Sequence, residues 1–354
     1  MKRGLALLVA ILCYFCTYSQ EVKADSNIPE FIVTPRFDVN PYAPIKGGYK
    51  GFDFGNSSLY TFLDGSVGNF SYSLCNHWVS TDTLSLYQNA FRSDDYDFID
   101  WLTLSYTVGQ FTFNVGKDVL AVGSAEYNYN DVDIHYPLAS TFWHKNAAYQ
   151  WGGSVNFTTK EENTTLRLQF ASSPFGERPF ASKLFAYSLN WTGEYGCFTP
   201  FWSVNFFEYE RGKFVNIIAL GNAFYMGNFT LEVDYMNRAT SIKNFFNQEF
   251  SVGAQLLYNH KDKVEVFAKG GYENYNSDIF GYDDDMWFIP TNNMLCPHYW
   301  YVGGGVHYFP LRESRDLRLH GVVAYNNFAN SVSISFGATY HFNLTQTILN
   351  NRKK

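Results

Sequence analysis

The chain has 354 residues, a formal net charge of −7 and an aromatic content of 19%. Beyond the N-terminus no segment reaches the roughly 20 consecutive apolar residues of a membrane-spanning helix, which excludes a helical membrane protein. The acidic balance and the lack of a basic patch argue against a nucleic-acid partner. So many aromatic residues exceed the needs of one soluble core, whereas a membrane β-barrel uses them in two interfacial girdles.

The first segment predicts export. A cationic start at Lys2 precedes an apolar run over residues 4–15, which is too short to span a membrane and has the length of a secretory signal core. We therefore expect residues 1–19 to be a signal peptide, with residue 24 as the alternative end. The mature chain then carries an odd number of scattered cysteines, so no disulfide framework is expected.

From residue 25 to residue 342 the sequence predicts a succession of β-strands. The pattern is clearest over residues 331–342, SVSISFGATYHF, where every second residue is apolar and small or polar residues lie between them. Strict alternation indicates a strand with one apolar and one wet face. On a helix the same apolar residues would spread around the whole circumference, with no coherent face to bury.

Two further segments are informative: one predicts the first strand and the other predicts a tight hairpin. Residues 31–40 alternate only in part, and Pro35 would confine such a strand to a barrel seam or a bulge. The clearest hairpin covers residues 101–117, where a two-residue turn at Gly109 and Gln110 joins two alternating runs.

The connections between the strands alternate in length. Short turns follow every second strand, while the long connections cover residues 80–97, 118–145, 172–180, 237–247 and 272–297. Outer-membrane barrels have short periplasmic turns and longer external loops, and closure by an even number raises about fifteen recognisable strands to about sixteen. The predicted fold is an all-β, transmembrane, antiparallel up-and-down barrel over residues 25–342. A soluble all-β carbohydrate-binding protein is the alternative.

The long connection over residues 118–145 is rich in acids and tyrosines. Its candidate pore-constriction residues are Glu126, Tyr127, Tyr129, Asp131, Asp133, His135 and Tyr136. Folded into a lumen, these side chains would favour cations or stack on sugars, because a ring of one charge sign sets the selectivity of a pore. An ordinary solvated external loop is the alternative.

The alternation also assigns charged residues of both signs to the lumen. These are Arg167, Glu232, Asp234, Lys263, Glu265, Lys269, Arg318 and His320, with His77, His307 and His341 also directed inward. Mixed signs are typical of a wet barrel wall, and the histidines lack partners at metal-ligand spacing. The acids at positions 283–285 are adjacent and lack the alternate spacing of a calcium loop, which favours a solvated loop tip. No metal or other cofactor is expected.

Two segments resemble outer-membrane porins. The closing alternation that ends in Tyr340-His341-Phe342 is similar to the β-signal by which outer-membrane proteins are recognised for assembly. The hairpin over residues 101–117 is similar to the one before the pore-constricting third loop in Gram-negative porins of the phosphate-selective porin O and P group and their carbohydrate-porin relatives. The chain departs from these proteins in continuing through a tail over residues 343–354. It also lacks a lysine cluster at the constriction, so phosphate selectivity is not expected.

These observations predict an outer-membrane porin for passive diffusion of small hydrophilic solutes, with a preference for cations or sugars. At about sixteen strands a barrel is wide enough for an aqueous channel. An outer-membrane enzyme and a plugged structural or adhesive barrel are the alternatives, and we expect no enzymatic activity. The expected partners are outer-membrane lipid, the barrel-assembly machinery, the solutes and, as a further option, two more copies of the chain in a homotrimer.

Overall fold

The computed structural model describes residues 28–44, 51–55, 57–80, 99–140, 143, 149–176, 178–241, 243, 249–274, 298–312, 314–327 and 331–352. The expected signal peptide over residues 1–19, with its alternative end at residue 24, lies outside the described residues, as do Asp283, Asp284 and Asp285. In the described part of the chain, no helix is both long enough and apolar enough to cross a membrane.

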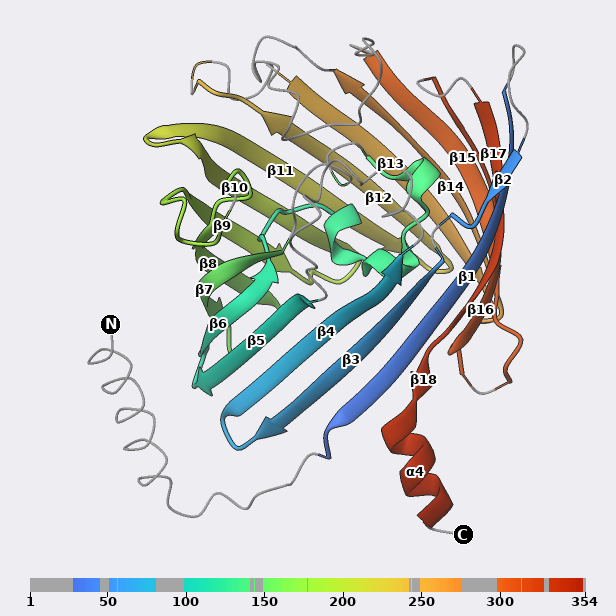
Figure 1. Cartoon of the computed structure of the whole chain (residues 1–354), viewed down its shortest axis with the longest axis horizontal. Coiled ribbons are helices and arrows are strands. Elements are labelled where there is room, and N and C mark those ends of the chain that lie inside the picture. The colour runs from blue at the N-terminus through green and yellow to red at the C-terminus, as the bar shows by residue number, and fades with distance from the viewer. Residues whose placement is uncertain are drawn as a thin grey trace.

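Strands dominate the described fold (Figure 1). They are β1 (Glu30–Pro44), β2 (Gly51–Asp53), β3 (Ser58–Val67), β4 (Phe70–Ser80), β5 (Ile99–Val108), β6 (Phe111–Val119), β7 (Tyr149–Thr158), β8 (Thr164–Ser172), β9 (Phe185–Gly193), β10 (Phe198–Glu210), β11 (Lys213–Met226), β12 (Phe229–Arg238), β13 (Glu249–His260), β14 (Val264–Asn274), β15 (His298–Tyr308), β16 (Leu317–Asn326), β17 (Ser331–Tyr340) and β18 (Phe342–Asn343). The named helices are η1 (Glu126–Asn128), η2 (Asp131–Asp133), η3 (Tyr136–Leu138) and α4 (Leu344–Arg352).

The strands close into a ring. Each long strand pairs antiparallel with its neighbours in the chain, and β1 joins the two ends by pairing with β17 on one side and β3 on the other. The strands β2 and β18 are short additions, so the described residues form a closed barrel of sixteen long strands. The predicted all-β, antiparallel up-and-down barrel is confirmed.

The first strand carries a proline at the seam. Pro35 pairs with Leu59 on β3, whereas the ladder from β1 to β17 and β18 has a gap at this position. Proline has no N–H to offer to a second ladder, which limits it to such places. Beside the gap, the Thr34 hydroxyl hydrogen-bonds Nδ1 of His341 at 3.0 Å. Of the two places that the sequence left open for this strand, a seam or a bulge, the structure shows the seam.

The two faces of the barrel differ as the alternation predicts. On β5, Leu102 and Leu104 turn outward, with 39% and 44% of their surfaces exposed. The inward residues of this part of the wall are polar and hydrogen-bonded across three strands. The Ser105 hydroxyl on β5 donates to Oδ1 of Asn114 on β6 at 2.7 Å, and the Asn114 amide donates to Ser154 on β7 at 3.0 Å. An apolar outside and a hydrogen-bonded polar inside are the arrangement of a membrane barrel.

Aromatic rings gather on the outer face near both rims. Next to the short turns, Phe111 and Phe157 have ring centroids 5.3 Å apart. Towards the opposite strand ends, Trp300 and Tyr325 have centroids 5.0 Å apart. Rings at both rims correspond to the two aromatic girdles that flank the apolar band of a membrane-spanning barrel.

The connections show the expected difference between the two rims. On one rim, two-residue turns join β3 to β4, β5 to β6 and β11 to β12. Gly109 and Gly227 adopt φ values of 58° and 63° in two of these turns, a conformation in which a side chain would be strained. The opposite rim carries longer connections, although Arg211 and Gly212 form a two-residue exception between β10 and β11.

Candidate functional site

The connection between β6 and β7 lies inside the barrel. It is described over residues 120–140 and at residue 143, and Figure 1 shows its short helices η1, η2 and η3 within the ring of strands. Each helix is a single turn; η1, for example, is closed by the N–H of Tyr129 donating to the carbonyl of Glu126 at 3.3 Å. Val132 and Leu138 are each 1% exposed and pack against wall residues. We call residues 120–140 the inner loop.

The inner loop begins by following the wall at very short range. The N–H of Gly123 donates to the Ser203 hydroxyl at 2.7 Å, and the N–H of Gly221 donates to the carbonyl of Gly123 at 3.0 Å. A Cβ at Gly123 would lie 2.5 Å from the backbone nitrogen of Ser203, so this approach requires glycine. Asn205 completes the contact by donating to the carbonyl of Ala121 at 2.8 Å.

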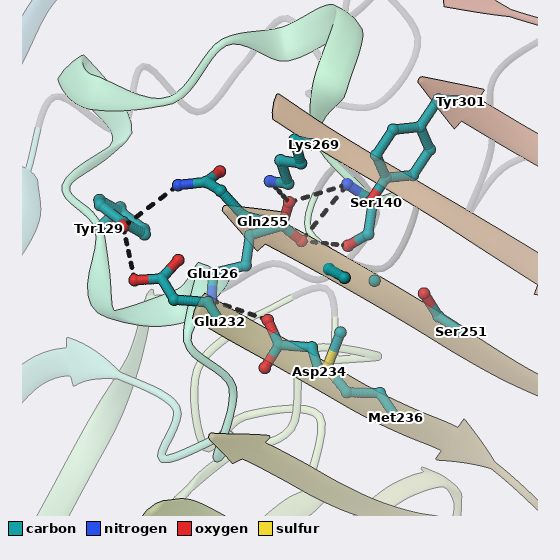
Figure 2. Close-up of a pocket in the computed structure, with 12 residues that line it drawn as sticks. Glu126, Tyr129, Ser140, Glu232, Asp234, Met236, Ser251, Gln255, Lys269 and Tyr301 are labelled. Carbon is teal, nitrogen blue, oxygen red and sulfur yellow. Dashed lines mark hydrogen bonds and ion pairs between the residues drawn. The ribbon is translucent and has the colours of Figure 1, made fainter. Parts of the chain in front are cut away.

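Asp234 on β12 holds the start of η1. Its Oδ1 accepts from the N–H of Ala125 at 2.7 Å. Its Oδ2 accepts from the N–H of Glu126 at 3.2 Å, the contact drawn in Figure 2. The first N–H groups of a helix have no partner within the helix, and a carboxylate is well suited to receive them. An inward acid on the wall thereby fixes where the inner loop turns.

Glu126 is buried and fully engaged. Its Oε1 lies 2.6 Å from Nζ of Lys269 on β14, and its carboxylate also accepts from the backbone N–H and the hydroxyl of Ser140. Burial by itself would raise the pKa of this carboxyl group, but the Lys269 ammonium and the Ser140 hydrogen bonds outweigh burial and hold the pKa of Glu126 below its usual value. Glu126 is therefore an anion with a fixed partner.

Tyr129 contacts the next row of wall residues. Its hydroxyl donates to Oε1 of Glu232 at 2.7 Å and accepts a longer bond of 3.4 Å from the Gln255 amide (Figure 2). Burial, reinforced by the Glu232 carboxylate, raises the pKa of the Tyr129 phenol, so the hydroxyl keeps its proton and donates.

A second set of contacts fastens the middle of the inner loop to the seam. The Arg36 guanidinium on β1 donates to the carbonyls of Val132 and Ile134 at 2.7 Å each, and pairs with Asp38 at 2.8 Å. On β16, Arg318 pairs with Asp133 at 2.8 Å. Arg36 and Asp38 are both removed from water, whereas the buried Arg318 pairs with a carboxylate that is still 23% exposed.

Three imidazole rings meet beside these arginines. Nε2 of His135 lies 2.9 Å from Nε2 of His307, whose Nδ1 lies 2.8 Å from Glu265, and His320 lies 3.2 Å from Asp38. Burial lowers the pKa of His135 well below its usual value, and the nearby Arg36 charge adds to this, so the ring is neutral. Within the described ranges, no group of His, Cys, Asp and Glu side chains is arranged to hold a metal ion.

The fold has known counterparts among solved structures. No protein-family model and no curated protein sequence matches this chain. The outer-membrane channel DcaP of Acinetobacter baumannii superposes with a TM-score of 0.57 at 12% identity, covering 91% of this chain and 99% of that one. A mutant of Rh. blastica porin gives 0.55 at 12% identity over 89% and 100%. The trimer form of in-vitro folded Vibrio cholerae OmpT gives 0.55 at 11% identity over 90% and 100%.

The chain has the fold of outer-membrane porins. At 11–12% identity, the similarity shows a shared barrel fold and no more. The assignment to the porin O and P group stays a prediction.

Within this porin fold, the remaining candidate residues of the inner loop have structural partners. Tyr127 packs against a buried apolar cluster inside the wall that includes Leu120, Phe207 and Met236. The ring of Tyr136 lies 5.4 Å from that of Trp143, between centroids. Burial raises the pKa of the Asp131 carboxyl group to about 6, although a hydrogen bond from Tyr149 opposes the shift.

The residues assigned to the lumen by alternation have two outcomes. Arg167 pairs with Asp118 at 2.7 Å. Glu232, Asp234, Lys269, Arg318 and His320 contact the inner loop or the seam as described above, whereas Glu265 contacts His307 on β15 and Arg315. Lys263 lies in the turn before β14, where its ammonium bonds the Leu311 carbonyl of the next turn. Its assignment to the lumen stays a prediction.

Several important contacts escaped the sequence reading. Arg36 and Asp38 alternate inward on β1, a signal that was present but obscured by Pro35 in the same strand. Ser140 carried no signal, because a single serine in a long connection gives no indication of its partner.

Proposed function

We propose that this chain is an outer-membrane channel for passive diffusion of small hydrophilic solutes. The observation that carries the proposal is a closed barrel of sixteen long strands, among the described residues, with polar and charged side chains on its inner face. A barrel of about this strand number is wide enough for an aqueous passage. The fold similarity to outer-membrane channels supports the same function and location.

The inner loop is proposed to narrow this passage. It is tethered at Asp234 and Lys269 on one side of the barrel and at Arg36 and Arg318 near the seam. A segment held at two places by ion pairs and backbone hydrogen bonds is a fixed obstacle, because moving it away would leave buried charges such as Arg36 and Lys269 without these partners.

The ion pairs of the inner loop change the selectivity that we expect for the channel. A ring of unpaired charges of one sign would select ions, but Glu126 and Asp133 are matched by Lys269 and Arg318. The loop tyrosines are engaged in packing or hydrogen bonds, which gives no support to stacking on sugars. We therefore propose that the inner loop selects mainly by size and that its acids confer little cation preference on the wild-type channel.

Single-channel recording tests the function itself. The full chain, purified from outer membranes and inserted into a planar lipid bilayer, should give discrete conductance steps. Absence of steps from protein whose folded state is verified by heat-modifiable gel migration would favour a plugged structural or adhesive barrel instead.

Reversal potential under a salt gradient tests the role of the inner loop. In the combined variant Glu126→Gln, Asp131→Asn and Asp133→Asn, the ammonium of Lys269 and the guanidinium of Arg318 lose their counter-charges. The channel should then shift towards anions, because unpaired cations at a narrow point attract them. Unchanged selectivity and conductance would place the inner loop away from the permeation path.

Assembly and location complete the proposal. We propose export through the predicted signal peptide, insertion by the barrel-assembly machinery with Tyr340 and Phe342 as the assembly signal, and a homotrimer in outer-membrane lipid. Fractionation, with crosslinking in the intact membrane, tests these points, and recovery as a soluble monomer would contradict them.

A further inference from the structure

The chain continues beyond its closing strand at the rim that carries the two-residue turns. β1 starts at this rim, because Glu30 pairs with Asp64 shortly before the turn from β3 to β4. β18 ends at the same rim, and α4 (Leu344–Arg352) follows it directly and extends away from the strands (Figure 1). The start of the barrel wall and the start of the tail therefore lie side by side.

The seam is thin at this place. Beyond the gap at Pro35, two residue pairs join β1 to β18, at Ile32 and Val33. The longer ladder to β17 begins on the other side of the gap, at Arg36. The ends of a ladder open easily, because few hydrogen bonds hold them. The rim end of the seam therefore gains from any further contact between the two chain ends.

Thr345, in the first turn of α4, supplies two such contacts. Its hydroxyl oxygen accepts from the N–H of Phe31 at 3.0 Å, and the hydroxyl donates to the carbonyl of Pro29 at 2.8 Å. One side chain thus satisfies two backbone groups at the beginning of the barrel wall. The partners are 314 and 316 positions apart in the chain, so these bonds require a closed barrel.

Asn343 supplies a third contact and also sets the start of the helix. Its amide donates to Oε1 of Glu30, and its Oδ1 accepts from the N–H of Gln346 at 2.9 Å. The second bond is that of a helix N-cap, which gives a partner to an N–H group of the first turn that the helix itself leaves free. α4 therefore begins directly after the seam, and this start brings Thr345 to the backbone around the beginning of β1.

We propose that the start of the tail, residues 343–345, is a strap that locks the seam after the barrel has closed. Its contacts join residues 29–31 to the end of β18, so they form once β1 has paired with the last strands. They must break before the seam can reopen at this rim. The strap follows Tyr340 and Phe342 in the chain, which separates it from the proposed assembly signal, and it acts whatever solute passes through the channel.

Hydrogen exchange of the full chain in detergent micelles tests the strap. Thr345→Val keeps the shape of the side chain and removes its hydrogen bonds to Phe31 and Pro29. The amides of Ile32, Val33 and Phe342, which belong to the ladder and not to the strap, should then exchange about tenfold faster, because the loss of neutral hydrogen bonds lets the seam open more often.

Thr347→Val is the matched control in the same helix. The Thr347 hydroxyl donates to the carbonyl of Asn343 at 2.8 Å, a bond within the tail. This variant should leave exchange at the seam at the wild-type rate. The rate of thermal unfolding, followed by heat-modifiable gel migration, should likewise rise in Thr345→Val and stay unchanged in Thr347→Val.

Two results would overturn the strap. One is equal seam exchange in Thr345→Val, Thr347→Val and wild type. The other is a uniform acceleration that includes the hairpin of β11 and β12, away from the seam, because the tail would then have no particular hold on the seam. If Thr345→Val does not fold, Glu30→Ala removes the Asn343 contact from the β1 side and is judged by the same comparison.

Discussion

At the scale of single residues, the pair of Lys269 and Glu126 sets the position of the inner loop. Their side chains are 14% and 5% exposed, so Lys269→Met would leave a carboxylate buried without its cation. Removal of one partner of a buried pair costs about 3–5 kcal/mol, whereas replacement of both is far milder. We expect Lys269→Met to raise the hydrogen-exchange rates of inner-loop amides strongly.

The double variant Lys269→Met with Glu126→Gln is the matched control. It removes both charges and keeps a group that can hydrogen-bond Ser140, so most of the protection should return. Equal loss of protection in the single and the double variant would show that the ion pair does not hold the loop.

Asp131 gives the inner loop a pH dependence of known sign. Its pKa is raised from 3.8 to about 6 by burial, so the folded protein holds this proton more tightly than the unfolded chain does. Its stabilising contribution is complete below pH 3.8 and is lost as the pH rises through about 6. The loop of the wild type should therefore gain hydrogen-exchange protection at mildly acidic pH relative to neutral pH.

Asp131→Asn isolates this contribution, because the amide does not titrate. The difference in pH dependence between wild type and variant, after correction for intrinsic exchange rates, is the quantity to measure. Identical pH dependence would assign the effect to other groups.

At the scale of one strand, β17 separates a lipid-facing from a wet position within three residues. Phe336 is 56% exposed on the outer face, whereas Ser333 pairs with the buried Ala324 on the inner face. A lysine in place of Phe336 near mid-membrane should cost about 2–4 kcal/mol, and Ser333→Lys should cost much less. Denaturant unfolding in lipid vesicles measures both, and equal losses would mean that the faces of β17 are assigned wrongly.

At the scale of the whole molecule, we expect the inner loop both to narrow the lumen, as proposed above, and to stabilise the barrel. Replacement of residues 126–139 by a glycine-serine linker of equal length should raise the single-channel conductance. It should also lower the stability of the barrel, because Val132 and Leu138 each contribute about 2 kcal/mol when fully buried.

A substitution on the same rim serves as the control for this replacement. Arg211→Asn alters the tight turn formed with Gly212 without touching the inner loop. It should leave the conductance unchanged. A loop replacement that stabilises the barrel or leaves the conductance at the wild-type value would contradict the proposed constriction.

The sequence by itself determined the strands, their faces and the seam. Alternation is a local signal, so the outward direction of Leu102 and the inward direction of Ser105 can be inferred from neighbouring residues. Pro35 lacks an N–H, which by itself limits its strand to a seam or a bulge. The same signal does not mark the strand boundary exactly, since Lys263 lies in the turn before β14.

Only the tertiary structure decided which inward residues meet. Glu126 and Lys269 are 143 positions apart, and their contact depends on the path of the inner loop across the closed barrel. Likewise, the row that joins Tyr301 to Asp234 across two glycines exists only in one register of four strands. A local pattern states the face on which a residue lies, but the partner on that face is set by closure, register and loop path, which are properties of the whole chain.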